Sequence, residues 1–152
     1  MGRYAEAQRE FLEAHRVLKA ASSEDHPWTL NNITWLRVLY EMWDEPQEAA
    51  GPLREIAALL RRVTRQAESE YGPDVRKTAC PRSHLGVCLI HLRRYEEAEH
   101  ELLEAHRALT AAREDWVGWT AKRLTALYEV WGKPAKAAAT RAKWQRAAGD
   151  RD

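Results

Sequence analysis

Apolar residues recur every three or four positions over residues 93–109, RRYEEAEHELLEAHRAL. This spacing places Tyr95, Ala98 and Leu102 on one face of a helix, while several glutamates take the solvent-facing side. The chain opens with closely related wording, GRYAEAQREFLEAHRVL, in which the same kinds of residue stand at the same spacing. An amphipathic helix that recurs within one chain predicts a repeat protein, and repeat proteins usually work as binding surfaces.

The same periodicity continues along the chain and predicts about seven helices joined by short turns, with no alternating strand. The expected helices cover residues 4–21, 30–43, 46–69, 82–92, 93–113 and 117–131, and a last one follows Pro134. In the first, Leu12, Val17 and Leu18 are expected to extend the apolar face. Two points stay open. The Gly51-Pro52 pair can bend or delay the third helix, and residues 75–80 can form a segment kinked at Pro81.

The second half of the chain restates the first. The segment LYEMWDEPQEAA at residues 39–50 corresponds to LYEVWGKPAKAA at residues 127–138. Each half contains two helical hairpins, so the repeating unit is a helix pair of roughly forty residues.

This pattern resembles the tetratricopeptide repeat (TPR). The positions that carry the resemblance are Leu85, Gly86, Tyr95, Ala98, Leu102 and Ala105 in one unit, and Leu124, Tyr128, Gly132 and Ala137 in the next. The resemblance implies an all-α, right-handed superhelix of antiparallel helical hairpins. It divides a single repeat domain, residues 1–152, into a half repeat at 1–24 and repeats at 25–72, 73–113 and 114–149.

Two finer resemblances concern context. The sequence DHPWTL at residues 25–30 is similar to the opening of the longer, kinesin-light-chain-like repeats. The ending LYEVWGKPAKAAATRAKW is similar to the repeat tails of some bacterial serine/threonine kinases, a resemblance that transfers no activity. Because the first unit lacks its first helix, an apolar face that includes Phe11 and Leu18 needs a neighbour. We interpret the chain as a fragment of a longer protein, and the alternative is self-association through the end helices.

In the TPR family, partner peptides lie in a concave groove lined by the first helix of each pair. The resemblance therefore implies a partner-binding groove lined by Asn31, Thr34, Val38, Glu41, Cys80, Ser83, Val87, Ile90, Trp119, Lys122, Ala126 and Glu129. The Lys/Asn/Arg set with which some members hold a terminal carboxylate is not reproduced. A mixed apolar and polar groove suits an extended or helical peptide. Trp119 and Trp35 fall off the buried stripe, and Trp119 is the expected anchor.

Composition limits the class of partner and the cellular location that we expect. The 152 residues carry a formal net charge of +1, which gives no basic field for nucleic acid. No apolar run approaches the ~20 residues that span a membrane, and the polar N-terminus does not read as a signal peptide. A cytoplasmic location is expected. Cys80 and Cys88 stand about 12 Å apart on one helix, too far for a disulfide, and are expected to be free thiols.

Cys80, His84, Cys88 and His91 form one stripe if the helix runs through Pro81. A metal site of soft ligands is one interpretation, but one straight helix usually brings only two ligands to an ion. The favoured interpretation is that Cys88 fills a core position with the histidines at its edge, so no metal or other cofactor is expected. No phosphate loop, nucleophile elbow or kinase catalytic loop is present, so an enzyme is not expected.

We therefore expect a non-catalytic protein-interaction module that binds a protein or peptide segment. The alternatives are a regulatory or sensory fragment of a larger bacterial signalling protein, and a homo-oligomerising scaffold.

Overall fold

The computed structural model describes residues 2–21, 46–112 and 117–149, together with residues 32, 35, 38, 39 and 42. These residues form helices and short turns, and no strand occurs among them, which confirms the all-α class. The helices are α1 (Gly2–Ala21), α3 (Pro46–Tyr71), α4 (Arg76–His91), α5 (Tyr95–Ala111), α6 (Val117–Val130) and α7 (Pro134–Gly149). The five separate residues between α1 and α3 are helical too, and the rest of the helix expected at 30–43 lies outside the described residues.

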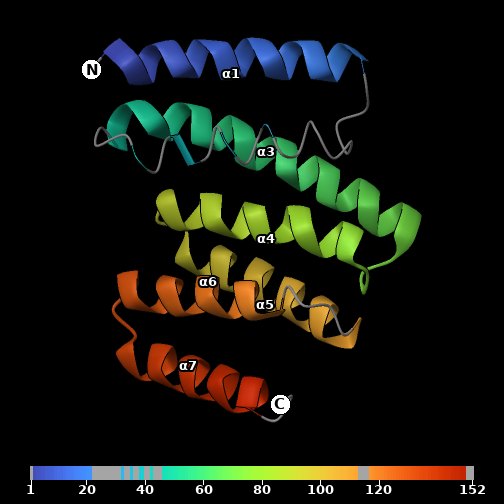
Figure 1. Ribbon diagram of the computed structural model, residues 1–152, viewed down its shortest axis with the longest axis vertical. Coiled ribbons are helices and arrows are strands. Elements are labelled where there is room, and N and C mark those ends of the chain that lie inside the picture. Colours follow the sequence, from blue (N-terminus) through green and yellow to red (C-terminus); the bar gives the residue numbers. More distant parts are fainter. Residues whose placement is uncertain are drawn as a thin grey trace.

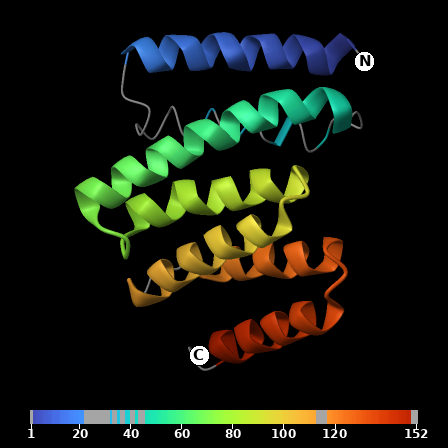
Figure 2. The ribbon, with the colours of Figure 1, turned by 180° about the vertical axis from the view of Figure 1, so that it is seen from behind.

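The helices form a stack in chain order. Figures 1 and 2 show α1 at one end and α7 at the other, so that the two termini lie at opposite ends of the molecule. Each of α3, α4, α5 and α6 packs on the helix that follows it, and α4 also contacts α6. The chain thus builds its interior layer by layer.

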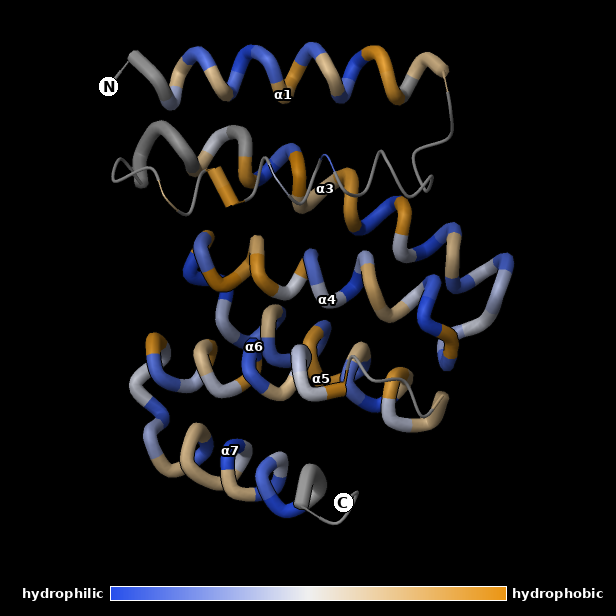
Figure 3. Tube along the Cα trace, viewed as in Figure 1, coloured by the Kyte–Doolittle hydropathy of each residue, from blue (hydrophilic) through white to orange (hydrophobic). Residues whose placement is uncertain are grey.

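The apolar stripes of the helices meet in one main core cluster. Hydrophobic and hydrophilic residues alternate along each helix in Figure 3, as expected where only one face is buried. The largest fully buried apolar side chains of this cluster are Leu60, Val63, Leu85, Leu89, Leu102 and Leu127. Close approach of α4 and α5 depends on Gly86, because a Cβ there would lie 2.6 Å from Cγ of Leu102. The small residue at this position is therefore a packing requirement.

The turns after α4 and α6 have the same construction. The N–H of Arg93 donates to the carbonyl of Ile90 (2.9 Å), and the next N–H donates to the carbonyl of Leu89 (2.9 Å). Gly132 makes the equivalent bond to the carbonyl three residues before it (3.2 Å). This is the Schellman ending of a helix, which needs a left-handed residue. Arg93 (φ 57°) and Gly132 (φ 71°) supply it, and only the glycine does so without steric cost.

Both prolines left open by the sequence lie inside continuous helices. α3 runs through Gly51 and Pro52, and α4 runs through Pro81, so residues 76–80 belong to the same helix as residues 82–91. Packing favours the continuous α4, since Thr78 and Ala79 before the proline are fully buried. The Thr78 hydroxyl also donates to the Gly72 carbonyl (2.7 Å) and fixes the start of the helix.

The apolar stripe of α1 is narrower than expected. Phe11 packs against the main core cluster. Leu12 and Val17, which were expected to extend the stripe, are 44% and 52% exposed. The prediction of Leu12 and Val17 as core positions is wrong. The half-buried residues of α1 repeat at intervals of three and four and include Phe11 and Leu18, whereas Leu12 and Val17 lie beside this stripe.

Charged side chains tie three neighbouring helices together. The Arg82 side chain of α4 is only 12% exposed and lies 2.9 Å from Glu68 of α3, 3.5 Å from Glu101 and 3.8 Å from Glu104 of α5. Burial raises the pKa of the Glu101 carboxyl, and the positive charge of Arg82 opposes that rise. Arg82 is therefore the counter-charge that lets these carboxylates lie at the packed edge of the three helices.

Candidate partner-binding surface

The predicted groove residues differ widely in accessibility. Lys122, Ala126 and Glu129 of α6 are exposed, Val38, Cys80, Ile90 and Trp119 are half-buried, and Ser83 and Val87 are buried. The predicted positions Asn31, Thr34 and Glu41 lie outside the described residues. Ser83 was expected to line an open groove, but its oxygen instead accepts a hydrogen bond from Nη1 of Arg123 (2.7 Å). The accessible part of the predicted groove thus lies on α6.

Trp119 is a fixed wall of this surface. The guanidinium carbon of Arg123, one helical turn further along α6, lies 3.3 Å from the centroid of the Trp119 ring. The His84 ring of α4 meets the same indole edge-on, with centroids 5.3 Å apart. With the Arg123–Ser83 hydrogen bond, these contacts join α4 to α6 and hold the indole in one orientation. Sequence reasoning missed Arg123, although its spacing of four from Trp119 was visible.

A hollow of about 350 Å³ lies between α6 and α7 at the end of the stack. It is lined by Ala121, Lys122, Thr125, Ala126, Glu129, Arg141, Trp144 and Gln145. Three predicted groove residues therefore meet in one concave place. The α7 residues were missed, because the groove positions were carried over only to the first helix of each pair. Arg141 pairs with Glu129, whereas Lys122 has no ion pair among the described residues.

An exposed apolar strip lies on the helical residues before α3. Trp35 is 53% exposed and Met42 is 64% exposed, with the half-buried Val38 between them. Their spacing of three and four puts them on one face of a helix. Trp35 was expected off the buried stripe, and Met42 was not singled out. Large exposed apolar side chains on one face are typical of a binding surface.

The stripe of cysteine and histidine residues does not converge. Cys88 is fully buried in the main core cluster, Cys80 and His84 are half-buried, and His91 is exposed. Among the described residues, no three His, Cys, Asp or Glu side chains come together in a way that could hold a metal ion. Cys80 and Cys88 do not form a disulfide, as expected. The stripe therefore spreads from core to surface along α4.

Glu99 of α5 joins the last three helices. It accepts hydrogen bonds from the hydroxyl of Tyr128 (2.8 Å) and from Nζ of Lys136 (2.7 Å). Partial burial works against its ionisation, but these two donors outweigh it and lower the pKa of the Glu99 carboxyl. Burial chiefly raises the pKa of Tyr128, and the hydrogen bond to the Glu99 carboxylate raises it further. This network ties α6 and α7 to α5.

No helix among the described residues combines the length and the apolar character needed to cross a bilayer. Comparison of the sequence with protein-family models gives no match, and comparison with curated proteins gives no relative. The function is therefore argued from the geometry of this surface.

Proposed function

We propose that this protein is a non-catalytic interaction module of the TPR type, a right-handed superhelix of antiparallel hairpins that binds a peptide segment along the strip of Trp35, Val38 and Met42, along α4 and along α6. One observation carries the proposal: Lys122, Ala126 and Glu129, which the repeat pattern marks as groove positions, line one hollow of about 350 Å³. A hollow that size holds one or two side chains of a bound segment. A bacterial source and a cytoplasmic location belong to the same proposal, and a regulatory or sensory fragment of a larger bacterial signalling protein is its alternative.

The chemistry of the surface indicates what the segment contains. The Trp35, Val38 and Met42 strip offers apolar contact area, and the fixed Trp119 ring adds a rigid aromatic wall. Lys122 is a cation whose charge is not neutralised by an ion pair among the described residues, while Arg141 and Glu129 neutralise one another. A segment with apolar side chains and an acidic residue complements these features.

A selection from a random peptide library displayed on phage tests the proposal. We expect enriched peptides to pair an acidic residue with aromatic or aliphatic ones, and to lose most of their affinity for Lys122→Glu. The matched control is Lys143→Glu, an equal charge change on α7 at a residue that does not line this hollow. Circular dichroism verifies that both variants keep their helicity. Peptides that bind Lys122→Glu as tightly as the original protein would show that the groove is elsewhere.

A second candidate function is self-association through α1. It is favoured by Leu12 and Val17, two large apolar side chains that are about half exposed on the outermost helix of the stack (Figure 1). Light scattering over a range of concentrations tests it. If α1 forms the contact, the mass rises with concentration and Leu12→Glu abolishes the rise. A mass that does not change with concentration excludes this function.

A further inference from the structure

A second and larger hollow lies on the other side of α6, between α5 and α7. From α6, Val117, Ala121 and Leu124 line it. At 100° per residue these positions stand on roughly the opposite side of the helix from Trp119 and Lys122. The site is therefore separate from the proposed peptide groove, although Ala121 and Trp144 border both hollows.

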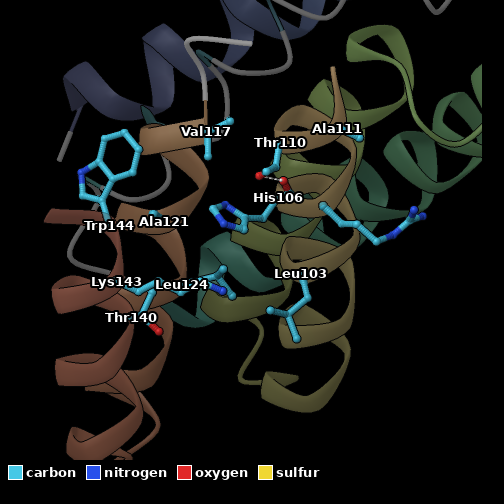
Figure 4. A pocket seen from close by; sticks show the side chains of 11 residues that line it. Leu103, His106, Thr110, Ala111, Val117, Ala121, Leu124, Thr140, Lys143 and Trp144 are labelled. Atoms are coloured by element: carbon cyan, nitrogen blue, oxygen red, sulfur yellow. Dashed lines mark hydrogen bonds between the residues drawn. The ribbon is translucent and has the colours of Figure 1, made fainter. Parts of the chain in front are cut away.

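The volume and the walls of this hollow suit a small molecule. It measures about 640 Å³, within the range of ligand pockets in proteins. Leu103, Val117, Ala121 and Leu124 form its apolar surface, and in Figure 4 the ring of His106 extends from α5 toward α6 among them. A concave apolar surface with a few polar groups is the usual composition of such a pocket.

Two side chains of the wall are held in position. A Cβ on Gly118 would lie 2.2 Å from Cζ2 of Trp144, so the indole lies directly on the backbone of α6. Nδ1 of His106 lies 2.8 Å from Oγ1 of Thr120, and that hydroxyl donates to the carbonyl of Val117 (2.9 Å). Since the hydroxyl has only one proton, His106 donates from Nδ1, and its other ring nitrogen is an acceptor when the ring is neutral. A wall with fixed rotamers loses little entropy when a ligand binds.

The two ionised side chains that line this hollow are both basic. Arg107 and Lys143 line it, and no carboxylate does so among the described residues. Arg107 is already paired with Asp74 (2.7 Å) and Glu104 (3.0 Å), whereas Lys143 makes no ion pair among the described residues. Burial chiefly lowers the pKa of His106, and the positive charge of Lys143 lowers it further, against a hydrogen bond with the Val117 backbone. The ammonium group of Lys143 is therefore the one charge lining the hollow that is not neutralised by an ion pair among the described residues.

We propose that the hollow between α5, α6 and α7 binds a small amphipathic carboxylate, with its apolar part against Val117, Ala121 and Leu124 and its carboxylate at Lys143. Charge complementarity selects the anion, because a cationic or neutral molecule of the same shape lacks the contact with Lys143. The hydroxyl of Thr140, which also lines the hollow, is a second donor for the carboxylate.

Octanoate is a suitable probe, with octyltrimethylammonium and octan-1-ol as the cationic and neutral comparisons. Isothermal titration calorimetry measures binding to the full chain. We expect saturable 1:1 binding of octanoate, weaker binding of octan-1-ol and none of the cation. Lys143→Glu removes one attractive charge and adds a repulsive one, so the affinity for octanoate falls about tenfold. Lys122→Glu, the matched charge change on the other side of α6, leaves the affinity unchanged.

A second readout locates the ligand. A bound carboxylate neutralises Lys143, so the NMR titration of the His106 ring moves toward higher pH in the presence of octanoate. The proposal is overturned if octanoate gives no saturable binding, if the cation binds as tightly, if Lys143→Glu keeps the full affinity, or if the His106 titration does not move. None of these outcomes bears on peptide binding at the groove, which is tested separately.

Discussion

The effect of Gly118→Ala on the stability of the protein should change sign when Trp144 is replaced. Alanine is a better helix former than glycine, and Gly118→Ala on that ground alone would stabilise α6 by up to about 1 kcal/mol. The added Cβ would lie 2.2 Å and 2.5 Å from Cζ2 and Cη2 of Trp144, far inside van der Waals contact. A rigid indole relieves such a clash only by moving away from α6, and overpacking of this kind costs about 1–3 kcal/mol. We therefore expect Gly118→Ala to destabilise the protein by about 1 kcal/mol.

In a Trp144→Ala background the clash is gone, so Gly118→Ala should stabilise the protein by up to about 1 kcal/mol, which gives a coupling energy of about 2 kcal/mol. Urea unfolding followed by circular dichroism measures the four members of this cycle. The matched control is Gly51→Ala in α3, where nothing outside the two chain neighbours lies within 4 Å of an added Cβ, so its effect on stability should be the same in both backgrounds. Equal effects of Gly118→Ala in the two backgrounds would refute the reasoning.

Three further predictions concern single side chains. Arg93→Gly should raise the free energy of unfolding by up to about 1 kcal/mol, because glycine adopts the left-handed conformation of this residue without steric cost. Gly132→Ala at the equivalent turn should lower the free energy of unfolding by a similar amount. Chemical denaturation measures both variants, and effects of the same sign would contradict the argument from strain. The pKa of His106 is lowered in the folded state, so the unfolded state binds the proton more tightly and stability is lost as the pH falls below about 6.5. His106→Gln should therefore reduce the change in the thermal unfolding midpoint between pH 7 and pH 5. A variant whose midpoint changes with pH as much as that of the original protein would contradict this prediction. Arg82→Met should cost about 2 kcal/mol because it leaves partly buried carboxylates without their cation. Arg107→Met removes a solvent-exposed ion pair and should cost clearly less by the same denaturation assay, and an equal cost would contradict the argument from burial.

The sequence predicts the bounds of the helices in the second half closely, because nearby residues in the chain mark where these helices begin and end. A stripe with Tyr95 and Ala98 begins α5, and Gly132 followed by Pro134 marks the turn between α6 and α7. The continuity of α4 could not be predicted in this way. Its first turns are held by the burial of Thr78 and Ala79, a tertiary effect that a proline rule does not include.

The site was predictable only in part for a similar reason. The resemblance to the TPR family implies that Lys122 and Glu129 of α6 line a groove, and both residues are accessible. It does not give the distance between neighbouring helices, which decides that Ser83 is buried under Arg123 and that Trp144 from α7 completes the hollow. The accessibility of a side chain and the shape of a cavity depend on how separate helices pack together, whereas the spacing of apolar residues describes one helix at a time.

The order of the stack has a consequence for how the molecule opens. Since each helix packs chiefly on its chain neighbours, α7 contacts α6 and can leave it while the α3, α4 and α5 layers stay closed. Hydrogen exchange should therefore be graded along the molecule, with fast exchange in α7 and the slowest amides in α4, which has packed helices on both sides. A ligand that contacts both α5 and α7 would stabilise the packed position of α7, and its binding would slow hydrogen exchange in α7 alone.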